Sequence, residues 1–203
     1  MAPKNFFIAI ILGVALAAGI FVAANVRKPA EVQAAFILPE PSGLPAFSLL
    51  DQFSNRVGAD VFQGQWDLVF FGFANCPDIC PITLQTLANA KSELSGLQQE
   101  ALPRIVLVSV DPERDTPELL GRYVDYFGEG NLALTGELAE VKKLTAALGV
   151  YFEKSPSDGE NYGVDHSAVV IVINPDGEFS ALFSAPHIIE SYVHDLPIIM
   201  GRN

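Results

Sequence analysis

The stretch Phe71-Gly-Phe-Ala-Asn-Cys76-Pro-Asp-Ile-Cys80-Pro81 holds both cysteines of this 203-residue chain. Before it, Trp66–Phe73 is an apolar, β-rich run of strand length, and after it leucine and isoleucine recur with helical spacing. The two thiols therefore lie where a buried strand passes into a helix. Two thiols so spaced can act together on one metal ion or form one disulfide.

The start of that helix predicts the chemical state of the pair. Pro81 suits the first helical position, which makes Cys80 the expected N-cap residue. Free backbone N–H groups and the positive end of the helix dipole would then point at the sulfurs. Such a setting lowers the pKa of a thiol, so we expect the thiolate form to be favoured.

A structural disulfide is the simpler alternative, because two cysteines in an oxidising compartment often pair for stability. It fits this chain poorly. So short a loop removes little entropy from the unfolded state, and a domain of this size can bury a sufficient core without a disulfide.

An uncharged apolar run, Phe6–Ala24, lies near the start of the chain between Lys4 and Arg27. It is long enough to cross a bilayer as a helix and longer than the apolar core of most signal peptides, although a cleaved signal peptide is the alternative. We therefore expect residues 1–28 to be a single N-terminal membrane anchor. The expected location is a bacterial inner membrane, with the C-terminal domain facing the periplasm.

The rest of the chain divides into a linker and one domain. Residues 29–45 are rich in proline and small residues and are expected to form a tether, and residues 46–203 are expected to form the domain. The formal net charge of −12 argues against nucleic acid as a partner, because phosphate binding requires a basic surface.

Strand and helix patterns alternate through this domain, which predicts an α/β fold with a central mixed sheet flanked by helices. The cysteines follow a central strand, at the edge where open α/β sheets place their sites. Besides Trp66–Phe73 and the helix after it, the expected elements are a short hairpin formed by Phe47–Leu50 and the stretch around Val57, strands Arg104–Val110, Leu132–Thr135, Val150–Phe152, Ala168–Ile173 and Glu178–Phe183, and helices that begin after Thr116, at Glu137 and at Ile188.

Histidine is the natural complement to the thiols, because thiolates select copper(I), zinc or iron–sulfur clusters, and imidazole suits copper and zinc. Two sulfurs alone leave a copper ion short of a full shell. His166 stands just before the long apolar run Ala168–Ile173, so it is either the third ligand or a structural residue. For His187 and His194 we expect surface or capping roles.

Four aspartates, near the cysteines, near His166 and after the strand Arg104–Val110, could serve the site or the local backbone. Asp165 either orients the His166 ring or forms a turn, and Asp78, between the cysteines, is expected to shape the loop. Asp111 and Asp115 each lie close to a proline that indicates a turn or a helix start. We therefore expect this last pair to be structural rather than an acid–base pair.

Three motifs together resemble the Sco (SenC) family, membrane-anchored copper chaperones for cytochrome c oxidase. The likeness extends over about Phe36–Pro197 in the same order. The motifs are Cys76-Pro-Asp-Ile-Cys80-Pro, Val108-Ser-Val-Asp111-Pro-Glu-Arg-Asp-Thr-Pro117, and Val164-Asp165-His166-Ser followed by a β-run and Pro175-Asp-Gly177.

The resemblance implies a thioredoxin-like fold in which Cys76, Cys80 and His166 correspond to the ligands of copper, as Cu(I) and Cu(II). It implies delivery of copper, received from a periplasmic donor, to the copper A centre of cytochrome c oxidase subunit II. The same likeness also allows reduction of the cysteines of that subunit before it receives metal.

Other thiol chemistry is the alternative class of function. A thiol-disulfide oxidoreductase would use Cys76 and Cys80 as its redox pair. Ordinary thioredoxin-like reductases, which this chain resembles in fold, instead carry a shorter Cys-x-x-Cys pattern faced by a cis-proline. Here the spacing is one residue longer, and His166 stands in the matching stretch, which favours metal binding. A thiol peroxidase is less expected still, because Phe73 stands where a threonine would precede the reactive cysteine.

Overall fold

The computed structural model describes residues 10, 12–21, 31–97, 101–155 and 162–201. The chain divides into two units, Met1–Glu31 and Val32–Asn203. In the first unit, residues 10 and 12–21 are helical, and the rest of the expected anchor lies outside the described residues. Within the described ranges, no helix combines the length and the apolar character needed to span a bilayer. The membrane anchor stays a prediction.

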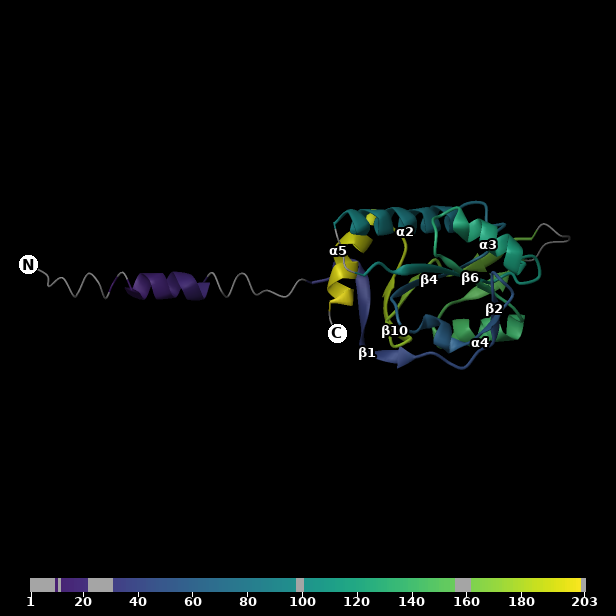
Figure 1. Cartoon of the computed structure of the whole chain (residues 1–203), viewed down its shortest axis with the longest axis horizontal. Helices are drawn as coiled ribbons and strands as arrows, with labels where there is room; N and C mark the ends of the chain where they lie inside the picture. The colour runs from purple at the N-terminus through teal and green to yellow at the C-terminus, as the bar shows by residue number, and fades with distance from the viewer. Residues whose placement is uncertain (1–9, 11, 22–30, 98–100, 156–161, 202–203) are drawn as a thin grey trace, which may run out of the picture. The chain divides into compact units, whose positions relative to one another are not determined.

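The second unit is built on a mixed eight-stranded sheet, in the order β1-β10-β9-β4-β5-β6-β2-β3 (Figure 1). A separate pair, β7 and β8, forms a small antiparallel hairpin. The strands are β1 Ala35–Gly43, β2 Leu49–Asp51, β3 Arg56–Val57, β4 Asp67–Gly72, β5 Arg104–Ser109, β6 Leu132–Thr135, β7 Phe152–Lys154, β8 Val164–His166, β9 Val170–Ile173 and β10 Glu178–Phe183. The helices are η1 Ala59–Phe62, α2 Ile79–Gly96, α3 Pro117–Asp125, α4 Leu138–Ala147 and α5 Ile189–Met200.

Strand β4 lies at the centre of the sheet and carries the cysteine loop at its end. It runs parallel to β5 and antiparallel to β9, and all 6 of its residues are buried. Burial on both sides explains its continuous apolar sequence. Figure 1 shows α2 and α3 on one side of the sheet and α4 on the other. The predicted α/β architecture with a mixed sheet is confirmed.

The expected tether is wrong for residues 35–43, because these residues form β1, paired antiparallel to β10. The register of this pair shifts between Ile37 and Ser42, which is where Pro39 and Pro41 lie. Proline lacks an N–H donor and is accepted at bulges and on edge strands. Strand β1 is the outermost strand of the sheet, so the prolines mark an irregular edge rather than a linker.

The short elements near the site also differ from expectation. The strand expected at Val150–Phe152 lies two residues later, as β7, because its partner is β8, which the sequence pattern did not reveal. The last helix, expected to begin at Ile188, is α5, which begins at Ile189, ends at Met200 and includes Pro197.

A buried carboxylate joins α5 to the beginning of β1. Asp195 is fully buried and accepts the backbone N–H groups of Gln33, Ala34 and Ala35, each at 2.8 Å. The Nδ1 atom of His194 donates to the same carboxylate at 2.7 Å. Burial acts to raise the pKa of Asp195, but these hydrogen bonds outweigh it and hold the pKa below its ordinary value.

We expect Asp195→Ala to lower the free energy of unfolding by about 2–4 kcal/mol, since it leaves three donors without their charged acceptor. Because the folded-state pKa of Asp195 is lowered, its contribution is present above the ordinary pKa and is lost as pH falls through the folded value. Urea unfolding at neutral and acidic pH measures both effects. Asp125→Asn, an exposed change on α3, is the control. A decrease in the free energy of unfolding for Asp195→Ala that is no larger than the decrease for the control would contradict this account.

Candidate metal centre

The loop between β4 and α2 brings the two sulfurs together. Cys76 lies in the loop and is partly buried, while Cys80 lies in the first turn of α2 and is buried. The backbone N–H of Cys76 donates to the carbonyl oxygen of Phe73 at 3.2 Å. The backbone N–H of Cys80 donates to the Sγ atom of Cys76 at 3.4 Å. The Cys76 sulfur therefore sits at the N-terminus of α2.

Helix α2 begins two residues earlier than expected. Its first residue is Ile79 and its N-cap is Asp78, so the prediction that Cys80 caps the helix is wrong. Pro81 is the third helical residue, where its missing N–H costs nothing because the first N–H groups of a helix have no partner within it. Asp78 lies at the end of the loop, and its side chain makes no capping hydrogen bond, so its loop-shaping role stays a prediction.

Burial decides the protonation state of Cys80. It raises the pKa of the Cys80 thiol well above its ordinary value, and the contact with Cys76 adds to the effect. The expectation of a thiolate-favouring environment is therefore wrong for Cys80 in the metal-free protein, because desolvation outweighs the helix dipole. Loss of this proton requires a positive charge at the sulfur, which a bound cation supplies.

The imidazole of His166 faces the buried sulfur. His166 lies on β8, and its Nε2 atom is 3.4 Å from the Sγ atom of Cys80. Its Nδ1 atom is 3.2 Å from the carbonyl oxygen of Ser167. A carbonyl can only accept, so Nδ1 carries the proton and Nε2 presents a lone pair to the sulfur. Burial lowers the pKa of His166, which favours this neutral ring.

Aromatic contacts hold the ring in this orientation. The His166 ring meets the rings of Phe70 and Phe73 edge to face, with centroids 5.7 and 6.0 Å apart. Gly72 makes room beneath the site, because a Cβ atom there would lie 2.9 Å from the Sγ atom of Cys80 and from the ring of Phe70. Gly72 is not among the residues predicted for the site. Its signal in the sequence is a glycine at the end of a buried strand.

The three predicted ligands are thus brought together. One ligand atom each from Cys76, Cys80 and His166 lies within 4.8 Å of the other two. Across the described part of the chain, this is the one such group of cysteine, histidine and carboxylate side chains. Two sulfurs and one imidazole nitrogen form a soft donor set of the kind that suits copper or zinc.

Asp115 ties the cysteine loop to the end of β5. Its carboxylate accepts the hydroxyl of Ser109 at 2.6 Å and the backbone N–H of Ala74 at 3.2 Å. Asp111 accepts the hydroxyl of Tyr162 at 2.7 Å. Both aspartates are therefore structural, as expected. The support that Asp115 gives to the loop could not be predicted from sequence, because its partners come from two other segments.

The other predicted candidates lie outside the cluster. Asp165 is exposed and accepts the hydroxyl of Ser155 at 3.1 Å, so the alternative in which it orients the His166 ring is wrong. That role belongs to the carbonyl of Ser167. His194 is exposed beside Asp195. His187 is partly buried and bonds to the backbone of Ala168.

Asp115 predicts a pH dependence of stability. Burial raises the pKa of Asp115 to about 6, the neighbouring Asp111 adds to the rise, and the bonds from Ser109 and Ala74 and the charge of Arg114 act against it. The folded protein thus holds this proton more tightly than the unfolded chain does. The contribution of Asp115 is fully present below its ordinary pKa and decreases as pH rises to about 6.

We expect Asp115→Asn to remove this decrease in the metal-free protein, since an amide oxygen can still accept from Ser109 and Ala74. As pH rises from about 4 to about 7, the free energy of unfolding of the variant, relative to that of the wild type, should increase by on the order of 1–3 kcal/mol. Denaturant unfolding at several pH values measures the difference. A difference that is constant with pH, like that of Asp125→Asn, would count against the assignment.

Comparison with known proteins finds relatives of this chain. The SCO1/SenC family model matches residues 39–200. The chain is 33% identical over 166 residues to a protein of Stutzerimonas stutzeri described as copper-binding, covering 82% of this chain and 81% of that protein. It is 40% identical over 151 residues to the mitochondrial SCO2 homolog of Mus musculus, covering 71% of this chain and 59% of that protein.

A solved structure shows the same fold. The crystal structure of Arabidopsis thaliana ScoI with copper bound superposes with a TM-score of 0.74 and 31% identity, covering 79% of this chain and 99% of that one. The mixed sheet and its helices thus form the thioredoxin-like fold that the family resemblance implies. The chain spans most of the bacterial relative but under two thirds of the mouse protein.

Proposed function

Because the chain belongs to the SCO1/SenC family, we propose that it binds copper through Cys76, Cys80 and His166 and delivers it during the assembly of cytochrome c oxidase. One observation carries the proposal: two thiols and a neutral imidazole converge within 4.8 Å. Thiolate and imidazole together satisfy copper in both oxidation states. The copper in the Arabidopsis relative, which has the same fold, supports copper over zinc.

The three ligands have different parts in this function. Cu(I) is bound mainly by the two soft sulfurs, whereas Cu(II) depends strongly on the nitrogen of His166 as well. Cys80 is buried and Cys76 is partly exposed, so an incoming ligand from the client replaces Cys76 first. Release then proceeds by exchange of one ligand at a time, and Cys80 recovers its proton as the metal leaves.

The proposal extends to the client and the location. The client is subunit II of cytochrome c oxidase, at its copper A centre, and the copper comes from a periplasmic donor. Residues 1–28 anchor the protein in a bacterial inner membrane, with the α/β unit in the periplasm. The apolar run Phe6–Ala24 and the family resemblance support this arrangement.

A thiol-disulfide oxidoreductase is the second candidate, and one observation favours it. Cys76 and Cys80 are both free thiols, and the backbone N–H of Cys80 reaches the Cys76 sulfur at 3.4 Å. Cys76 would attack a disulfide of the client, and the buried Cys80 would then displace the client thiol from the mixed disulfide. The products would be a client whose copper-binding cysteines are reduced and a disulfide between Cys76 and Cys80.

Deletion of the gene separates the two candidates. If the protein delivers copper, oxidase activity should fall mainly when copper is scarce, and added copper should restore part of it by mass action. If the protein chiefly reduces client cysteines, a membrane-permeant thiol reductant should restore activity and copper should not. Rescue by the reductant alone would overturn copper delivery.

A further inference from the structure

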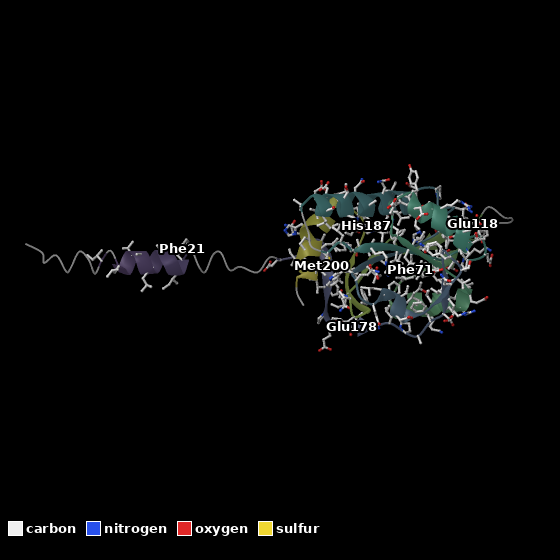
Figure 2. All side chains as sticks on the ribbon, in the orientation of Figure 1. Phe21, Phe71, Glu118, Glu178, His187 and Met200 are labelled. Atoms are coloured by element: carbon white, nitrogen blue, oxygen red, sulfur yellow. The ribbon has the colours of Figure 1, made fainter. Side chains whose placement is uncertain are left out.

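His187, which is labelled in Figure 2, lies between β10 and α5. Both of its ring nitrogens are hydrogen-bonded. The Nε2 atom is 2.9 Å from the carbonyl oxygen of Ala168, and the Nδ1 atom is 2.7 Å from the hydroxyl oxygen of Tyr192. The carbonyl can only accept, so Nε2 donates to it. Burial lowers the pKa of His187, so the ring is neutral and Nδ1 accepts the Tyr192 O–H. The two bonds fix one tautomer.

Tyr192 is a rigid support for this ring. It is fully buried in the first turns of α5, and its ring packs against Phe183 of β10 with centroids 4.3 Å apart. The hydroxyl therefore has one position relative to the sheet. A fixed donor on Nδ1 holds the Nε2–H of His187 on the backbone of Ala168.

Ala168 belongs to the segment 167–169, which joins the strand of His166 to β9. Tyr151 holds the segment at Ser167: the Ser167 N–H donates to the Tyr151 carbonyl at 2.8 Å, and the Tyr151 N–H donates to the Ser167 hydroxyl at 3.0 Å. His187 holds it one residue later, at the Ala168 carbonyl. The carbonyl between these two attachments is that of Ser167, which accepts the Nδ1–H of His166.

We infer that His187 is a positioning residue for the copper site. With Tyr192 it fixes the segment 167–169, so that the Ser167 carbonyl holds Nδ1–H of His166 and directs Nε2 toward the sulfurs. The effect of His187 on copper binding rests on the proposed function. Its effect on the segment 167–169 is a property of the metal-free protein. The inference replaces the expectation of a surface or capping role for His187.

The test uses three variants of the whole chain that differ in one group each. Tyr192→Phe removes only the hydroxyl, His187→Ala removes the bridge, and His187→Gln supplies an amide N–H for Ala168 and an oxygen for Tyr192. His194→Ala, an exposed histidine on the same helix, is the matched control. Two quantities are measured: amide hydrogen exchange of residues 167–169 in the metal-free protein, and the affinities for Cu(II) and Cu(I).

In His187→Ala and Tyr192→Phe, exchange of these amides should accelerate and the Cu(II) affinity should fall about tenfold, the lower end of the usual effect of losing an outer partner of a ligand. The Cu(I) affinity should stay within about twofold, because the sulfurs are not disturbed. His187→Gln should recover most of the Cu(II) affinity. His194→Ala should match the wild type.

The outcomes distinguish this inference from the proposed function. Wild-type protein that binds no copper would overturn the proposed function, and the copper role of His187 with it. Wild-type protein that binds copper, with His187→Ala unchanged in exchange or in Cu(II) affinity, would overturn the inference alone. An equal loss of Cu(I) and Cu(II) affinity would also overturn it, because that result indicates general damage to the fold.

Discussion

Cys76→Ser and Cys80→Ser should each lower the affinity for Cu(I) by on the order of a thousandfold or more, because a serine hydroxyl is a hard, protonated donor that cannot replace a thiolate. One copper per chain should bind to the reduced wild type. After oxidation of Cys76 and Cys80 to a disulfide, none should bind, since a disulfide offers no thiolate. Anaerobic titration against a coloured Cu(I) chelator measures all four proteins.

The matched control for these variants is Asn75→Ser, which changes an exposed residue of the same loop without touching the ligands. It should bind Cu(I) like the wild type. Unchanged copper stoichiometry in the oxidised wild type, or in either cysteine variant, would contradict the proposed ligand set.

His166→Ala should separate the two oxidation states. Cu(II) affinity should fall by about a hundredfold or more, because Cu(II) requires the imidazole nitrogen, while Cu(I) affinity should change by less than about tenfold. The colour produced by sulfur-to-Cu(II) charge transfer should shift or disappear. Titration with each ion, followed by absorption spectra, measures these effects.

The same variant distinguishes metal transfer from thiol exchange in the cell. Thiol exchange requires an attacking thiolate and a resolving thiol, and His166 is neither. We expect His166→Ala to fail to restore oxidase activity in a deletion strain, as Cys76→Ser should, while His194→Ala should restore it. Full restoration by His166→Ala, with the cysteine variants inactive, would support the oxidoreductase instead.

The central fold could be predicted because its signals are local. Strand β4 is a continuous apolar run, and the helix after it shows apolar spacing within one segment. Strand β1 could not be predicted in the same way, since its prolines resemble a linker and its partner β10 is far along the chain. Its place in the sheet depends on pairing and on the bonds to Asp195, which local sequence does not encode.

The site was predictable to a similar degree. Cys76 and Cys80 are close in sequence, so their pairing could be predicted from their spacing. The role of His166 as the third ligand could be predicted only from several motifs taken together. The raised pKa of Cys80 could not be predicted from sequence, because it depends on burial over Gly72 and against the sheet. The supporting roles of Asp115 and His187 rest on bonds between distant segments, which a single sequence does not reveal.

X-ray absorption spectroscopy of the copper-loaded protein tests the central claim most directly, because it reports the atoms bound to the metal. The account predicts two sulfur neighbours for Cu(I) and Cu(II), and for Cu(II) an added imidazole signal that is lost in His166→Ala and kept in His194→Ala. A first shell of oxygen and nitrogen without sulfur, or an imidazole signal that survives in His166→Ala, would contradict it.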